Sequence, residues 1–175
     1  MAARMRPRSL DEVIGQNKAL LPGSPLQILA KADTENSSHT SILLWGPPGT
    51  GKTSIAKAVA SSSGRRFVEL SAVSTGVKEL RDVIEKAKVD QETYGVTTIV
   101  FLDEIHRFSK AQQDALLPSV ESGGILLIAA TTENPSFAVI APLLSRSLLV
   151  RLESLSQAAI SDLVQKALVE PRGLG

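Results

Sequence analysis

The sequence predicts an α/β fold in which a five-stranded parallel sheet lies between helices. Short runs of aliphatic and β-branched residues alternate along the chain with longer segments of helical periodicity, as in parallel α/β sheets. The runs are apolar at successive positions, so both faces of the strands are expected to be covered by helices. A glycine-rich turn directly after the first run is the third indication, because such turns join strands to helices in this class.

Five strands and four main helices are expected. The strands cover residues 41–45, 67–70, 98–102, 125–130 and 148–152. The helices run from the glycine-rich turn to about residue 62, over residues 77–88, from about residue 110, and from beyond residue 156. Ser109 is the expected N-cap of the third helix, and Pro118 is expected to bend that helix near its end. The polar, serine-rich stretch 33–40 is expected to be a surface loop.

The composition excludes several classes of protein. The 175 residues suit about one domain, and 19 Lys and Arg against 18 Asp and Glu give a net charge of +1. There is no cysteine, which excludes a disulfide scaffold, a thiol nucleophile and a cysteine zinc site. The longest apolar runs, such as 125–130, are far shorter than the ~20 residues that cross a bilayer, and the basic N-terminus lacks the apolar segment of a signal peptide. We therefore expect a soluble, cytoplasmic protein without a membrane partner.

The strongest motif is GPPGTGKT at residues 46–53, which matches G-x-x-x-x-G-K-[ST] between a predicted strand and a predicted helix. Glycines let the backbone approach phosphate oxygens closely, and the amides of a helix N-terminus favour an anion. Lys52 is expected to reach the β and γ phosphates, and the Thr53 hydroxyl to bind Mg²⁺. The expected nucleotide-binding residues of this loop are Gly46, Pro47, Pro48, Gly49, Thr50, Gly51, Lys52, Thr53 and Ser54.

An acidic pair follows the third predicted strand. Asp103 and Glu104 come directly after the apolar run 99–102, at the strand end that faces the nucleotide in a parallel sheet. Asp103 suits the coordination sphere of Mg²⁺, usually through water, and Glu104 suits activation of the attacking water. The alternative is that the two acids merely cap the next helix, which is a common position for acidic residues.

Together these residues resemble the AAA+ ATPases, in particular their clamp-loader branch. The closest resemblance is to the family of replication-associated recombination protein A (RarA, also called MgsA), the bacterial relatives of the Werner-helicase-interacting ATPase. It is carried by the segments 5–16, 44–53, 70–81, 101–115, 130–137 (ATTENPSF) and 143–146 (LLSR). The resemblance implies an AAA+ P-loop NTPase core that uses ATP and Mg²⁺.

Further site residues are implied by the resemblance alone. Val13, Ile14 and Gly15 are similar to the adenine-side segment, and their alternative is a turn that packs on the core. Thr132 is similar to the sensor 1 residue that orients the attacking water. Asn134 is the other candidate for that role, and its alternative is turn formation before Pro135.

The resemblance also implies contacts with other molecules. Arg146 is similar to the clamp-loader arginine finger, which acts on the nucleotide of a neighbouring subunit, so the full-length protein is expected to be a homo-oligomer. Lys78 and Arg81, with Arg107 and Lys110, are expected to hold DNA phosphates. The alternative for Lys78 and Arg81 is local pairing with the acids four residues further on, at 82 and 85.

The expected function is that of the Mg-ATP-binding and hydrolysing core of a DNA-dependent ATPase in replication-fork maintenance, DNA repair and recombination. The expected partners are DNA at single-strand/double-strand junctions or ends, and replisome or single-strand-binding proteins. Residues 1–154 are expected to form the nucleotide-binding subdomain and residues 155–175 the beginning of a helical lid. The isolated chain is expected to hydrolyse ATP weakly, because the lid and oligomerisation regions of the family are missing. Two alternatives are a non-hydrolysing ATP-binding scaffold and a Holliday-junction branch-migration motor.

Overall fold

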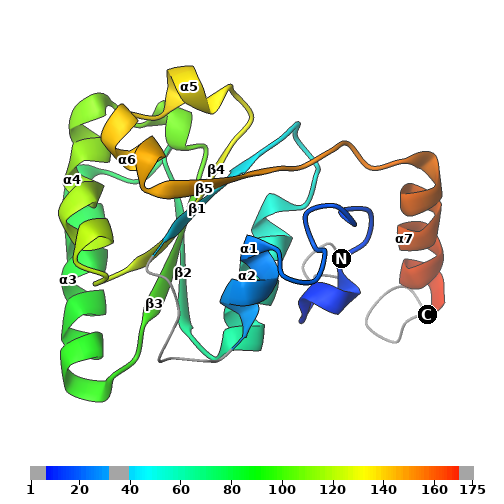
Figure 1. Cartoon of the computed structure of the whole chain (residues 1–175), viewed down its shortest axis with the longest axis horizontal. Coiled ribbons are helices and arrows are strands. Elements are labelled where there is room, and N and C mark those ends of the chain that lie inside the picture. Colours follow the sequence, from blue (N-terminus) through cyan, green and yellow to red (C-terminus); the bar gives the residue numbers. More distant parts are fainter. Residues whose placement is uncertain (1–6, 32–39, 170–175) are drawn as a thin grey trace.

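A computed structural model describes residues 7–31 and 40–169 of the chain. It contains a five-stranded sheet with strand order β2-β3-β4-β1-β5, in which every adjacent pair is parallel (Figure 1). The predicted fold class is therefore confirmed.

The helices and strands alternate along the chain as expected. The strands are β1 (Ser41–Trp45), β2 (Arg66–Ser71), β3 (Thr98–Asp103), β4 (Leu126–Thr131) and β5 (Ser147–Arg151). The helices are α1 (Pro25–Ala30), α2 (Lys52–Ser63), α3 (Val77–Tyr94), α4 (Lys110–Glu121), α5 (Pro135–Ala138), α6 (Ala141–Ser145) and α7 (Gln157–Val169), with 3-10 turns η1 (Leu10–Glu12) and η2 (Ile105–Arg107).

Each face of the sheet has its own hydrophobic core. On one face, alternate strand residues such as Ile42 and Phe101 pack with α1 and α2; on the other, Leu43 and Leu102 pack with α3, α4 and α6. Figure 1 shows α3 and α4 on one side of the sheet and α1 and α2 on the other. This two-sided burial is why β1, β3 and β4 are apolar at successive positions.

Local signals in the sequence set several helix boundaries. Ser109 caps α4 in a reciprocal arrangement, because its hydroxyl accepts from the Gln112 N–H while the Gln112 side chain accepts from the Ser109 N–H. Pro118 lies inside α4, which ends at Glu121. α3 continues beyond the expected residue 88 to Tyr94, where Gly95 ends it in the left-handed conformation.

The segment between β4 and β5 differs from the prediction. Two short helices, α5 and α6, occupy it, each with a proline in its first turn. Helices of four and five residues are too short to show a periodicity in the sequence. The loop expected at 33–40 lies almost entirely outside the described residues. Within those residues, no helix combines the length and the apolar character that crossing a membrane requires.

The strand order determines where the site forms. β3, β4 and β1 are consecutive in the sheet, and all three end at the same edge because they are parallel. The segments that follow them, which begin with Glu104, Thr132 and Gly46, are therefore neighbours in space although they are far apart in the sequence.

Candidate nucleotide-binding site

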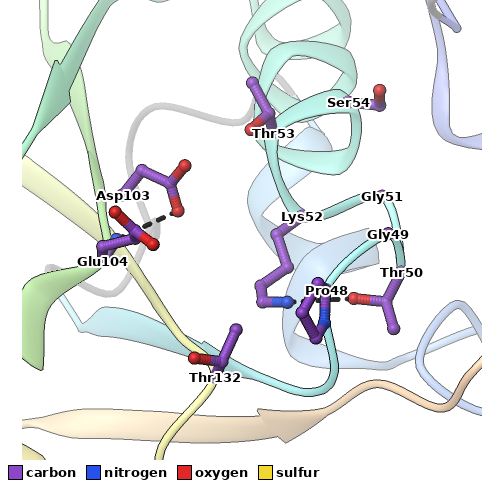
Figure 2. Close-up of a pocket in the computed structure, with 10 residues that line it drawn as sticks. All are labelled: Pro48, Gly49, Thr50, Gly51, Lys52, Thr53, Ser54, Asp103, Glu104 and Thr132. Atoms are coloured by element: carbon purple, nitrogen blue, oxygen red, sulfur yellow. Dashed lines mark hydrogen bonds between the residues drawn. The ribbon is translucent and has the colours of Figure 1, made fainter.

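A pocket of about 340 Å³ opens at the edge where β3, β4 and β1 end. It is lined by Pro48, Gly49, Thr50, Gly51, Lys52, Thr53, Ser54, Asp103, Glu104 and Thr132. In Figure 2 the Lys52 side chain extends along the turn of residues 48–51, and the two acids lie across the pocket from it. The structure thus brings together the phosphate loop, the acidic pair and Thr132, which lie in three separate segments of the sequence.

The glycines of the loop serve two different purposes. Gly49 and Gly51 have φ of 76° and 90°, in the left-handed region that favours glycine, and open space surrounds the position of a Cβ at each. Gly46 is required for packing, because a Cβ there would lie 2.7 Å from the Leu152 carbonyl oxygen. Gly46 and Pro47 line an adjoining cavity with Arg151 rather than the pocket itself.

Lys52 is the first residue of α2, and its side chain is buried against its own loop. Its Nζ donates to the Pro47 carbonyl at 2.8 Å and to the Thr50 hydroxyl at 3.1 Å. Burial lowers the pKa of Lys52, and the charge of Asp103 partly opposes this. Burying the charged lysine costs free energy. A bound phosphate group would offset this cost, because it would supply negative charge beside the desolvated ammonium group.

Asp103 is the last residue of β3, and its Oδ1 accepts from the Glu104 N–H at 3.0 Å. Burial raises the pKa of Asp103, and the charges of Glu104 and Glu69 add to this, whereas the Glu104 N–H and Lys52 oppose it. A bound cation would offset the electrostatic repulsion between these neighbouring carboxylates.

The oxygen donors in the pocket fit Mg²⁺. Thr53 offers a hydroxyl and Asp103 a carboxylate, which are hard donors of the kind Mg²⁺ prefers. Over the described parts of the chain, no group of three or more histidine and acidic side chains is arranged to hold a metal. A small donor set suits Mg²⁺, because this ion is usually held by one or two carboxylates together with water and substrate phosphates.

Glu104 has an unusual backbone conformation. Its φ is 55°, and it is the only non-glycine residue with positive φ among residues 7–31 and 40–169. The left-handed conformation costs an L-residue about 1–2 kcal/mol. It turns the chain sharply between β3 and η2, and both its carboxylate and that of Asp103 line the pocket.

The remaining predicted nucleotide residues are placed as follows. Thr132 lines the pocket, whereas the Asn134 Oδ1 accepts from the Ser136 N–H and caps α5, as the turn interpretation describes. Val13 and Ile14 are partly buried, Val13 against the core, and neither lines the pocket. Gly15 has φ of 87° and lies against Leu155 and Ala159, just beyond β5.

Arg146 lies at the opposite edge of the sheet. Arg146 directly precedes β5, whose first residue pairs with the first residue of β1. Arg146 therefore lies where β1 begins, whereas Lys52 lies beyond the point where β1 ends. The five residues of β1 alone separate the two edges by roughly 16 Å. The Arg146 guanidinium contacts the Glu121 carboxylate at 3.0 Å and donates to the Pro142 carbonyl at 2.9 Å.

The four predicted DNA-contacting cations are exposed. Lys78 and Arg81 lie in the first turns of α3, Arg107 ends η2 and Lys110 begins α4. The ion pairs within the described residues are Lys18–Glu153, Lys57–Glu69, Arg66–Asp90 and Arg146–Glu121. Lys78 and Arg81 therefore do not make the local pairs with Asp82 and Glu85 that were the alternative.

Two residues beside the pocket were not singled out from the sequence. His106 Nδ1 lies 3.0 Å from the Thr131 hydroxyl and so connects the turn after Glu104 to the end of β4. Gln16 is buried, and its amide contacts the Thr50 carbonyl and the backbone of Glu153. No local motif marks either residue, since their partners are 25 to 137 positions away.

The family model for ATPases associated with various cellular activities (AAA) matches residues 42–154. The chain belongs to the AAA family. The matched residues run from the second residue of β1 to just beyond β5, so the family model covers all of the sheet but one residue, and all of the pocket.

Two curated relatives match along the whole chain. An uncharacterised AAA domain-containing protein of Mycobacterium tuberculosis is 54% identical over 175 residues, and replication-associated recombination protein A of Escherichia coli is 46% identical over 176 residues. The chain spans 38% of the length of each. The resemblance predicted from the motifs is thus confirmed for the AAA domain.

A solved structure supports the same fold. The Thermotoga maritima RuvB Holliday junction branch migration motor superposes with a TM-score of 0.73 at 28% identity. The match covers 94% of this chain and 54% of the RuvB chain. The AAA chain described here therefore shares its core with a motor protein whose sequence is much less similar than that of the recombination protein.

The strain at Glu104 gives a stability prediction. Glu104→Gly and Glu104→Ala both remove the carboxylate, but only glycine adopts positive φ without steric cost. We expect the free energy of unfolding of the Gly variant to exceed that of the Ala variant by about 1 kcal/mol. Urea denaturation followed by circular dichroism measures it, and equal stability of the two variants would contradict a strained backbone.

The raised pKa of Asp103 gives a pH dependence. The folded state holds this proton more tightly than the unfolded state, in which the pKa is near 3.8. The contribution of Asp103 to stability is therefore complete below pH 3.8 and lost as pH rises through the folded-state pKa. Asp103→Asn keeps the acceptor oxygen, so we expect it to be more stable than the unchanged chain at pH 7, by a margin that shrinks towards pH 3.

Thermal unfolding from pH 3 to 8 measures this difference. Asp114→Asn, at an exposed position of α4, is the matched control and should show no such trend. An Asp103→Asn variant less stable than the unchanged chain at pH 7 would refute the assignment.

Proposed function

We propose that this AAA chain is the Mg-ATP-binding and hydrolysing core of a DNA-dependent ATPase in replication-fork maintenance, DNA repair and recombination. The observation that supports this most is the single pocket shared by the phosphate loop, the acidic pair and Thr132. An ATP-binding site needs only the loop, whereas hydrolysis also needs a carboxylate that accepts a proton from water.

Each pocket residue has a distinct proposed task. Lys52 and the amides of residues 49–54 bind the phosphates at the N-terminus of α2. Thr53 and Asp103 would hold Mg²⁺, which when bound neutralises phosphate charge. Glu104 accepts the proton of the attacking water, and Thr132 orients that water. Gln16 contacts the Thr50 carbonyl of the loop. The three residues before it, Val13, Ile14 and Gly15, are proposed to face the adenine side.

Arg146 is proposed to act on the nucleotide of a neighbouring copy. Its place at the edge opposite the pocket keeps it away from its own phosphates, so it fits a finger supplied in trans. In the single chain its charge is balanced by Glu121, which would have to release it when a neighbour's phosphates approach. The full-length protein is accordingly proposed to be a homo-oligomer.

DNA is proposed to bind across the first turns of α3 and the segment 107–110. These segments follow β2 and β3, which are neighbours in the sheet, so their cations share one edge of the molecule. Their ammonium and guanidinium groups are exposed and make no ion pair within the described chain, which suits contacts to phosphates rather than bases. Replisome or single-strand-binding proteins are proposed as further partners.

One alternative function rests on a specific observation. The structural match to RuvB supports a Holliday-junction branch-migration motor. The recombination protein is favoured because its identity to this chain is 46%, against 28% for RuvB. A non-hydrolysing scaffold is disfavoured by the presence of Glu104 in the pocket.

Residues 155–175, which include α7, are proposed to begin a helical lid beyond the subdomain 1–154.

Two variants test binding and hydrolysis separately. Lys52→Ala should weaken ATP binding at least tenfold, because a charge-assisted contact to phosphate is lost. Glu104→Gln should bind ATP normally while the hydrolysis rate falls roughly 100-fold or more, because the amide is not a base. Titration with fluorescent ATP measures binding, and phosphate release measures the hydrolysis rate. Lys57→Ala, at a lysine of α2 that does not line the pocket, is the matched control. Tight ATP binding by Lys52→Ala would refute the assignment.

The finger is tested by mixing two inactive variants. Both are made in a chimera that joins this chain to the C-terminal part of the E. coli relative. Arg146→Ala and Glu104→Gln should each hydrolyse ATP slowly, but their mixture should regain activity, because an intact Arg146 meets an intact Glu104 at mixed contacts. Phosphate release at fixed total protein measures this recovery. A mixture no faster than the two separate variants would exclude a finger acting in trans.

The DNA surface is tested through its salt dependence. Lys78→Ala with Arg81→Ala should weaken binding to a duplex with a single-stranded overhang. It should also reduce the slope of log K against log salt by about 1.4–1.8, at about 0.7–0.9 per phosphate contact. Fluorescence anisotropy at several salt concentrations measures both. Lys86→Ala with Lys88→Ala is the control, because it removes the same charge further along α3. Equal losses of DNA affinity in the two double variants would contradict a localised surface.

A further inference from the structure

Gln16 connects two parts of the molecule that are distant in the sequence. Only 4% of its surface is exposed. Its Nε2 donates to the Thr50 carbonyl at 3.1 Å and to the Glu153 carbonyl at 2.8 Å, and its Oε1 accepts from the Glu153 N–H at 3.2 Å. Thr50 belongs to the phosphate loop, and Glu153 lies between β5 and α7.

The partners of Gln16 determine the chemistry of this position. Two carbonyl oxygens require two donors, and one backbone N–H requires an acceptor. A primary amide offers both on one planar group, which neither a carboxylate nor an ammonium group does. The three contacts use both amide hydrogens and the oxygen, so a buried group is fully satisfied.

The hydrogen bonds continue from Gln16 to the phosphate-binding lysine. The Lys52 Nζ donates to the Thr50 hydroxyl at 3.1 Å, and that hydroxyl donates to the Pro47 carbonyl at 3.0 Å. The Thr50 carbonyl accepts from Gln16. An unbroken path therefore runs from the Lys52 ammonium through Thr50 and Gln16 to the backbone of Glu153.

The far end of this path leads to α7. Gly15 packs so closely that a Cβ there would lie 2.6 Å from Leu155 and 3.1 Å from Ala159. Ala159 is the one buried residue of the α7 segment that the structure describes. In Figure 1, α7 stands apart from the sheet, with the N-terminal segment between it and α2. Residues 15 and 16 therefore contact both α7 and the chain that leads into it.

We infer that Gln16 is a positioning residue that couples the conformation of the phosphate loop to the orientation of α7. When a nucleotide draws Lys52 away from Thr50, the Thr50 peptide is free to adjust. Gln16 transmits the adjustment to Glu153, because its amide holds both backbones at once. This inference rests on the proposed function, since it assumes that the pocket binds a nucleotide.

Hydrogen exchange with and without MgADP tests the coupling in the full chain. In the unchanged chain, MgADP should increase protection in residues 46–54 and also in residues 153–160. Gln16→Met keeps the length of the side chain without its polar groups, and Gln16→Glu keeps the acceptor but removes the donors. In both variants the protection at 46–54 should persist, while the change at 153–160 should disappear. The Kd for MgADP should rise roughly tenfold, as expected when a few hydrogen bonds that favour the bound state are lost.

Matched measurements separate the possible failures. Gln157→Met, the same substitution at an exposed position of α7, should retain both responses. Thermal unfolding identifies any Gln16 variant that does not fold, and the other variant is then used. If residues 153–160 respond normally in a folded Gln16 variant, or do not respond in the unchanged chain that binds MgADP, the inference is wrong. If MgADP does not bind the unchanged chain at all, it is the proposed function that fails.

Discussion

The parallel pairing of β1 with both β4 and β5 is the constraint on which the rest of the molecule depends. The pairing continues past the end of β1, because the Gly46 N–H donates to the Thr131 carbonyl and the Leu152 N–H donates to the Trp45 carbonyl. The first residue of the phosphate loop is thereby held between two neighbours, and a side chain at Gly46 would separate it from Leu152. The phosphate loop, the loop after β4 and the chain leading to α7 all take their positions from these three strands.

The pocket at the C-terminal ends of β1, β3 and β4 holds groups in states that folding alone disfavours. Lys52 is buried with a lowered pKa, Asp103 has a raised pKa, and Glu104 has a left-handed backbone. Each of these lowers the stability of the chain, and they lie around one pocket. Such concentration of strain and charge is typical of functional sites, where the surrounding fold compensates for it. Here the two apolar cores that cover the sheet provide that compensation.

The sheet and the main site residues could be predicted from the sequence because their signals are local. The apolar runs, the GPPGTGKT loop and the acids after the third strand each occupy a few consecutive residues, and parallel strands bring their ends to one edge. α5 and α6 could not be predicted, because one helical turn shows no periodicity. Nor could the partners of Gln16 and His106, since hydrogen bonds between residues 25 to 137 positions apart leave no pattern in the chain.

The separation of Arg146 from the pocket has a consequence for how copies of the chain assemble. If the arginine completes a neighbour's site, the contact joins the N-terminal edge of one sheet to the C-terminal edge of another. Two different surfaces then meet, and where a pair of copies makes only one such contact the interface is heterologous, that is, head to tail. Each added copy leaves one free surface of each kind, and the assembly has a polarity. It ends only by closing into a ring, or else continues as a helix of copies.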